Sequence, residues 1–153
     1  MEYLPDWSDD TIARVAFLLT KDMTVFEWGT GYSTIWLAQR CKQVIAMEHD
    51  PEWYTKIKQI ATEEGIENID FNVYPLVNDN YYTKIHNVDG IDFIIVDGRN
   101  RMRCFEEAFK LQKPIMLDDS QREKYRGAYL YGLDFKETLP TILGQKATLF
   151  NVK

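Results

Sequence analysis

Several marks of specialised proteins are absent from this sequence. Among its 153 residues only two are cysteines, Cys41 and Cys104, with no C-x-x-C pair and no histidine placed beside them as a zinc ligand. No apolar run is long enough to cross a bilayer, and the acidic N-terminal segment lacks the pattern of a signal peptide. We therefore expect a cytoplasmic protein with reduced thiols and no membrane partner.

An excess of positive charge is also absent. The chain has 18 lysines and arginines against 24 aspartates and glutamates, a formal net charge of -6. Proteins that bind nucleic acids generally do so through clustered basic side chains, so general nucleic-acid binding is not expected, although local basic patches remain open. The length fits a single domain, residues 1–153, and no repeat, low-complexity segment or linker divides it.

Two common catalytic motifs are missing as well. The sequence has neither a G-x-S-x-G nucleophile elbow nor a G-x-x-x-x-G-K phosphate loop, which removes support for hydrolase and NTPase functions.

What is present is an alternation of short apolar runs with helical patterns. Continuous apolar runs that alternate with helices predict an α/β fold with a mostly parallel sheet buried on both faces. Helix-start signals at Ser8 and at Asp50-Pro51 support this interpretation. The expected strands are residues 23–28, 43–49, 69–75, 91–98 and 113–120, followed by a hairpin of 133–140 and 146–153; the expected helices include 33–41, 51–64, 101–112 and one within 121–132.

Polar residues gather where the expected strands end. In parallel α/β sheets, ligands bind beyond the carboxyl ends of the strands, so these residues are the candidates for a site. They are Glu27, Gly29 and Gly31; Glu48, His49 and Asp50; Asp97, Gly98 and Arg99; and Asp118, Asp119 and Ser120.

The stretch VFEWGTGYST, residues 25–34, gives the first indication of a ligand. Glycines at 29 and 31 let a ligand approach the main chain closely, although a plain strand-to-helix turn has the same pattern. Glu48 ends the next expected strand, where a carboxylate can accept hydrogen bonds from ribose hydroxyls. No third glycine follows Gly31, which disfavours a dinucleotide pyrophosphate, and Glu27 would repel phosphate but favour a sulfonium or ammonium group.

Four stretches together resemble the class I S-adenosylmethionine (SAM)-dependent methyltransferases. They are VFEWGTGYST, VIAMEHDPEW, IDFIIVDGRNR and PIMLDDSQREKY, and the resemblance spans about residues 23–126. It implies a three-layer α/β/α Rossmann-like sandwich with a seven-stranded sheet in the order 3-2-1-4-5-7-6, strand 7 being antiparallel. The expected terminal hairpin would supply strands 6 and 7.

The resemblance also implies roles for single residues. Glu27, Gly29, Gly31 and Ser33 would surround the methionine part of SAM, Glu48 would hold the ribose, His49 would lie beside the adenine, and Asp97 would face the reacting methyl group. At Ser33 the sequence departs from the family, many members of which have glycine or another small residue there.

The acids after the fourth and fifth strands suggest a metal. Asp97, Asp118 and Asp119 could converge on Mg²⁺, as in catechol-type O-methyltransferases, which similarly draw metal ligands from these strand ends. The alternative is that Asp118 and Asp119 cap the next helix while Asp97 bonds its own loop.

Arginines follow the same two strands. Arg99 and Arg122 would either form salt bridges with the three acids or recognise an anionic acceptor beside Asp97. The expected activity is methyl transfer by in-line displacement to an oxygen of a small or glycan-like acceptor, with Asp97 and Arg99 as catalytic candidates. An NAD-dependent oxidoreductase and a catalytically silent cofactor-binding domain remain alternatives. Because little chain precedes the first strand, we expect an open pocket, completed either by a partner protomer or by a large acceptor.

Overall fold

The structure is a computed structural model that describes residues 1–152. Its centre is a seven-stranded sheet in the order β3-β2-β1-β4-β5-β7-β6. β7 runs antiparallel to both β5 and β6, while the strands from β1 to β5 pair with one another in parallel. The strands are β1 (Thr24–Trp28), β2 (Gln43–Glu48), β3 (Ile69–Val73), β4 (Ile91–Val96), β5 (Ile115–Asp118), β6 (Phe135–Glu137) and β7 (Ala147–Phe150). This arrangement confirms the predicted fold, including the terminal hairpin.

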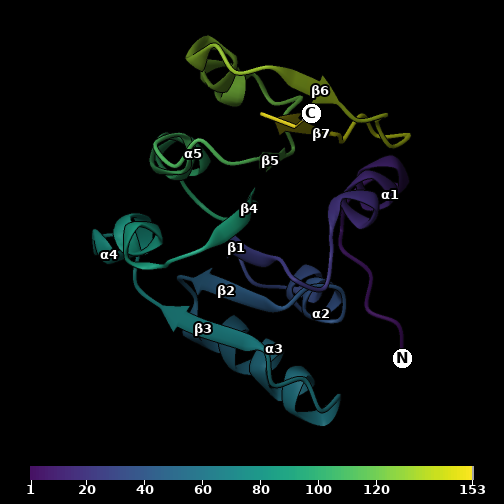
Figure 1. The fold of residues 1–153 in the computed structure, drawn as a ribbon, viewed down its shortest axis with the longest axis vertical. Helices are drawn as coiled ribbons and strands as arrows, with labels where there is room; N and C mark the ends of the chain where they lie inside the picture. The colour runs from purple at the N-terminus through teal and green to yellow at the C-terminus, as the bar shows by residue number, and fades with distance from the viewer. Residues whose placement is uncertain (153) are drawn as a thin grey trace.

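Helices cover both faces of the sheet, as Figure 1 shows. One face carries α1 (Asp9–Leu18), α2 (Tyr32–Ala38) and α3 (Pro51–Glu63). The other carries α4 (Asn80–Thr83), the 3₁₀ helix η1 (Lys84–Asn87), α5 (Arg101–Phe109) and the 3₁₀ helix η2 (Glu123–Tyr131). The structure is therefore the expected three-layer sandwich.

The continuous apolar runs are explained by this double covering. Side chains alternate along a strand, so Phe26 and Trp28 of β1 enter the core under α4 and α5, whereas Val25 enters the core under α1 and α2. All five residues of β1 are buried. Both faces of the central strands are dry, which removes the polar positions that a half-exposed strand would show.

The helix-start signals work as predicted. The Ser8 side chain accepts from Thr11 N at 3.2 Å, and the Asp50 side chain accepts from Glu52 N and Trp53 N at the start of α3. α2 is shorter than predicted because the N–H groups of Arg40 and Cys41 both bond to the Leu37 carbonyl in a tight final turn.

The predicted helix after β5 is present as 3₁₀ helix η2 rather than as an α-helix. Gly127 lies near its middle, where glycine weakens an α-helix. In the part of the chain that the structure describes, no helix combines the length and apolar character needed to cross a membrane.

Candidate active site at the carboxyl edge of the sheet

The polar residues singled out in the sequence meet at one edge of the sheet. Trp28 is aligned with Met47 of β2 and with Val96 of β4, and Val96 is aligned with Leu117 of β5. The loops that follow these strands therefore start side by side. Two backbone bonds tie them together, from Gly29 N to Met47 O at 2.8 Å and from Asp97 N to Trp28 O at 3.0 Å.

The presence of glycine at the two positions of the first loop has a different physical explanation in each case. Gly29 has φ of 94°, and a Cβ there would lie 2.5 Å from the Asp97 carbonyl oxygen, so this glycine allows two loops to pack. Gly31 has an extended backbone that any residue could adopt, and a Cβ there would meet only Ser33 Oγ, at 3.9 Å. Gly31 therefore leaves open surface beside the loop rather than relieving a clash.

Glu27 lies behind this loop rather than in front of it. The side chain is fully buried and accepts hydrogen bonds from the Ser33 hydroxyl and from Thr34 Oγ1, the latter at 2.6 Å. Thr34 Oγ1 in turn accepts from Gly31 N at 3.0 Å. Burial raises the pKa of Glu27 to about 8. In this structure Glu27 holds the loop in shape and lines neither of the clefts described below.

Glu48 joins the loop after β1 to the loop after β2. One carboxylate oxygen accepts from Thr30 N at 3.0 Å and from Thr30 Oγ1 at 2.5 Å. The other accepts from His49 N at 2.8 Å and Asp50 N at 3.1 Å, and it lies 3.0 Å from His49 Nδ1. Glu48 is almost fully buried, yet it borders the cleft.

The three aspartates of β4 and β5 converge on a guanidinium. Arg101 lies 3.3 Å from Asp97 Oδ1 and 3.5 Å from Asp119 Oδ2, and it donates to the Asp118 carbonyl oxygen at 2.8 Å. Arg101 thus provides the positive charge that a metal ion would otherwise supply. Among residues 1–152 no group of three acidic, histidine or cysteine side chains is arranged to hold a metal, so the predicted Mg²⁺ site on Asp97, Asp118 and Asp119 has no support.

Asp97 and Asp118 behave as a coupled acid pair. Burial, and then the charges of Asp97 and Asp119, raise the pKa of Asp118 to about 9. Burial also raises the pKa of Asp97, and this rise is opposed first by Arg101 and then by a hydrogen bond from Trp7. The Asp118 side chain is 4% exposed and that of Asp97 is 20% exposed. Asp118 is therefore the more deeply buried acid of the pair, and Asp97 is the member that reaches the cleft.

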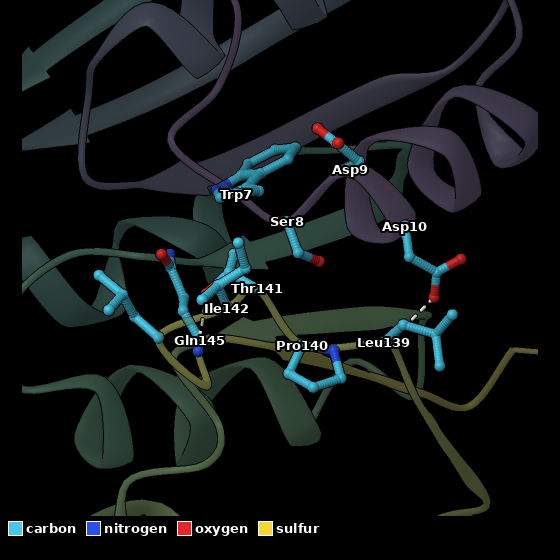
Figure 2. Close-up of a pocket in the computed structure, with 10 residues that line it drawn as sticks. Trp7, Ser8, Asp9, Asp10, Leu139, Pro140, Thr141, Ile142 and Gln145 are labelled. Atoms are coloured by element: carbon cyan, nitrogen blue, oxygen red, sulfur yellow. Dashed lines mark hydrogen bonds between the residues drawn. The ribbon is translucent and has the colours of Figure 1, made fainter.

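The N-terminal segment reaches the same edge through Trp7. Trp7 Nε1 donates to Asp97 Oδ2 at 3.0 Å. The segment is fastened to the β6–β7 connection by bonds from Leu139 N to Asp10 Oδ2 at 2.7 Å and from Gln145 Nε2 to Asp6 O at 2.8 Å. A hollow of about 610 Å³ lies between these two stretches. Figure 2 shows the side chains that line it, with the Trp7 ring among them.

Two clefts border the loops at this edge. One, of about 540 Å³, runs from Glu48 and His49 past Asp97 to Arg99. The other, of about 500 Å³, runs along Gly31 and Ser33 under the N-terminal segment. The residues common to both are Gly29, Thr30, Trp53 and Asp97. The two clefts are therefore adjoining parts of one surface.

The structure brings most of the predicted site residues to this surface. Gly29, Gly31, Ser33, Glu48, His49, Asp97 and Arg99 line one cleft or the other, whereas Glu27, Asp118 and Asp119 line neither. Of the predicted salt bridges, Arg122 pairs with Asp119 at 3.2 Å, while Arg99 is exposed.

No specific role in the site was predicted from the sequence for Trp7, Trp53 or Arg101, although Arg101 belongs to an arginine-rich segment expected at the mouth of the pocket and Trp53 was one of several aromatic residues that could line it. Trp53 Nε1 donates to the Thr30 carbonyl at 2.6 Å, which places the ring between the two clefts. Its position near the start of α3 was the available signal. Trp7 and Arg101 carry no comparable signal, because their partners lie on other elements.

Comparisons with known proteins agree with this architecture. No protein-family model matches the sequence, and no curated protein matches it. Among solved structures, an rRNA methylase from Streptococcus thermophilus matches with a TM-score of 0.64 at 19% identity, over 92% of each chain.

Two further solved structures are similar. A methyltransferase-like protein from Silicibacter pomeroyi matches with a TM-score of 0.68 at 18% identity, over 97% of this chain and 88% of the other. M. jannaschii TYW2, in complex with AdoMet, matches with a TM-score of 0.57 at 19% identity, over 95% of this chain and 76% of the other. The chain therefore has the Rossmann-like fold of the class I SAM-dependent methyltransferases.

Proposed function

We propose that this protein is a SAM-dependent methyltransferase that transfers a methyl group to an oxygen of its acceptor. The observation that carries the proposal is the cleft at the carboxyl edge of β1, β2 and β4, where the glycine loop meets Glu48, Asp50 and Asp97. Carboxylates around an open cleft suit a cofactor that carries a positive sulfonium and ribose hydroxyls. The similarity to solved methyltransferase structures supports the same choice.

The residues present fit the parts of this cofactor. The methionine part would lie along Gly29, Gly31 and Ser33, the ribose at Glu48, and the adenine beside His49. Both oxygens of Glu48 already accept bonds from protein donors, and one of these is the Thr30 hydroxyl. A ribose hydroxyl would take the place of that hydroxyl.

Asp97 is the group that would serve the acceptor. SAM supplies an electrophilic methyl group, so the protein has to align the acceptor, exclude water and remove the acceptor's proton. Asp97 lines both clefts, and its raised pKa makes it a stronger base than an ordinary aspartate. Arg101 and Trp7 hold its two oxygens in place.

A thermal-shift panel with SAM, S-adenosylhomocysteine (SAH), NAD and ATP tests the proposal. A ligand at a hundred times its Kd adds about 2.7 kcal/mol of stability, which raises the Tm of a chain of this size by roughly 5–10 °C. We expect such a rise with SAM and SAH only. The rise should shrink in Glu48→Gln, and the Tm of that variant without ligand measures any damage to the loop itself.

One alternative predicts a different result in the same panel, and the other is separated by an assay of SAM consumption. A nicotinamide-dependent oxidoreductase would be stabilised by NAD, and stabilisation by NAD alone would overturn the proposal. A silent cofactor-binding domain would be stabilised by SAM and SAH yet consume no SAM with any acceptor.

The proposed cytoplasmic location is consistent with Cys41 and Cys104 being buried, free thiols.

A further inference from the structure

Side chains of both charges border the larger cleft. The carboxylates are those of Glu48, Asp50 and Asp97. The cations include Arg99, Arg122 and Lys124, and we call these three side chains the basic lip. In a chain with a net charge of -6, a local concentration of cations beside a cleft is not explained by composition.

Most arginines near the cleft already have acidic partners. Arg101 forms ion pairs with Asp97, Asp118 and Asp119. Arg122 lies 3.2 Å from Asp119, and its side chain is half exposed. Arg99 and Lys124 are different, since neither side chain forms an ion pair with any residue among 1–152, and both are exposed. The basic lip therefore holds two uncompensated positive charges.

The main chain that carries Arg99 is held in place. Asn100 adopts a left-handed conformation, φ 51°, and its carbonyl accepts from Cys104 N at 3.1 Å. Its side-chain amide donates to Tyr82 Oη at 2.7 Å. Because the backbone is already fixed, an anion that binds the free guanidinium has to order the side chain but not the loop.

We infer that the methyl acceptor carries a compact anionic group, a phosphate or a carboxylate, that binds to Arg99 and Lys124 with Arg122 beside them. This inference rests on the proposed function, because SAM bound at the glycine loop and Glu48 would leave the side chains of the basic lip for the acceptor. A guanidinium can bind either oxyanion through two parallel hydrogen bonds, and an ammonium adds a mobile point charge. Asp97 lines the same cleft, so an acceptor anchored at the basic lip can bring a reactive oxygen to that base.

Binding of simple anions tests the inference. Inorganic pyrophosphate and citrate are titrated calorimetrically at low salt, in the presence of saturating SAH, into the wild type, Arg99→Ala/Lys124→Ala and Arg126→Ala. Arg126 is the matched control because it is exposed on the same segment and does not line the cleft. We expect at least a tenfold weaker affinity in the double variant and a change of less than twofold in the control. Stronger binding of pyrophosphate indicates a phosphate acceptor, and stronger binding of citrate a carboxylate.

Three results separate this inference from the proposed function. No anion binding in the wild type, or equal binding by all three proteins, would overturn the anionic acceptor. SAH is titrated first, alone, and should bind all three proteins alike. Absence of SAH binding in the wild type would instead contradict the methyltransferase proposal itself.

Discussion

Trp7 and Asp97 lie 90 residues apart in the chain and are joined by a hydrogen bond of 3.0 Å from Trp7 Nε1 to Asp97 Oδ2. This bond links the N-terminal segment to the end of β4. It holds one oxygen of the acid that we propose as the catalytic base. The other oxygen lies 3.3 Å from Arg101, so both are fixed.

Trp7→Phe should therefore destabilise the protein in a pH-dependent way. Phe keeps an aromatic ring against Trp36 but removes the N–H donor that lowers the pKa of Asp97. A hydrogen bond to a charged group contributes about 1.5–3 kcal/mol, so we expect the free energy of unfolding to fall by about this amount at pH 8. The fall should be smaller at pH 5, because a larger share of Asp97 is then protonated and no longer needs the donor. Urea denaturation at both pH values measures it. Trp53→Phe is the control, because the bond it removes goes to a neutral carbonyl and its loss should be the same at both pH values.

Replacing Arg101 should be far more costly than replacing Arg103 on the same helix. Arg101→Met leaves Asp97, Asp118 and Asp119 without their shared cation, and breaking a buried charge network in this way costs about 3–5 kcal/mol. Arg103 pairs with Asp79 on the surface, where an ion pair contributes about 0–1 kcal/mol. Denaturation at pH 8 compares the two variants, and equal losses would show that the acids do not depend on Arg101.

Glu27 should make the protein less stable as pH rises. Its pKa is about 8 in the folded protein against 4.5 for an ordinary glutamate, so the folded state holds a proton that the unfolded state has released. Its contribution is fully present below pH 4.5 and is lost as pH rises toward 8, with a slope approaching about 1.4 kcal/mol per pH unit. Glu27→Gln cannot ionise, so the stability difference, wild type minus variant, should fall across this range. A difference that stays constant with pH would mean that Glu27 is ionised in the folded protein.

The two glycines of the first loop should respond differently to alanine. Gly29→Ala forces a side chain into a positive-φ conformation and against the Asp97 carbonyl, which should cost more than about 2 kcal/mol of stability. Gly31→Ala should change stability by less than about 0.5 kcal/mol, because the backbone and the space both accept a Cβ. If the cofactor lies against residue 31, the same variant should bind SAH at least tenfold more weakly. Unchanged SAH affinity in a stable Gly31→Ala protein would place the cofactor elsewhere.

The fold was predictable because its signals are local. The central strands of the parallel part are short, mainly apolar runs, and β3 at the sheet edge alternates polar and apolar residues. Helix starts are marked by Ser8 and by Asp50-Pro51, so the element order follows from neighbouring residues. The parallel topology then brings the strand ends together, which is why Glu48, Asp97 and Arg99 could be assigned to one edge.

The parts that were missed depend on contacts between distant segments. Nothing near Arg101 in the sequence distinguishes it from Arg99 or Arg103, yet only Arg101 reaches all three aspartates. Trp7 likewise shows no special pattern in the sequence. Its contact with Asp97 depends on the hydrogen bonds that hold the N-terminal segment to the β6–β7 connection. The placement of Glu27 behind its loop depends on the hydroxyls of Ser33 and Thr34, whose direction is set only when α2 begins.

A crystal structure of the protein soaked with SAH tests the central claim most directly. We predict density for SAH across the two adjoining clefts, with its methionine part along Gly29 and Gly31 and its ribose hydroxyls on Glu48 in place of the Thr30 hydroxyl. Density for SAH elsewhere on the molecule, or clefts that stay empty at saturating SAH, would contradict the account.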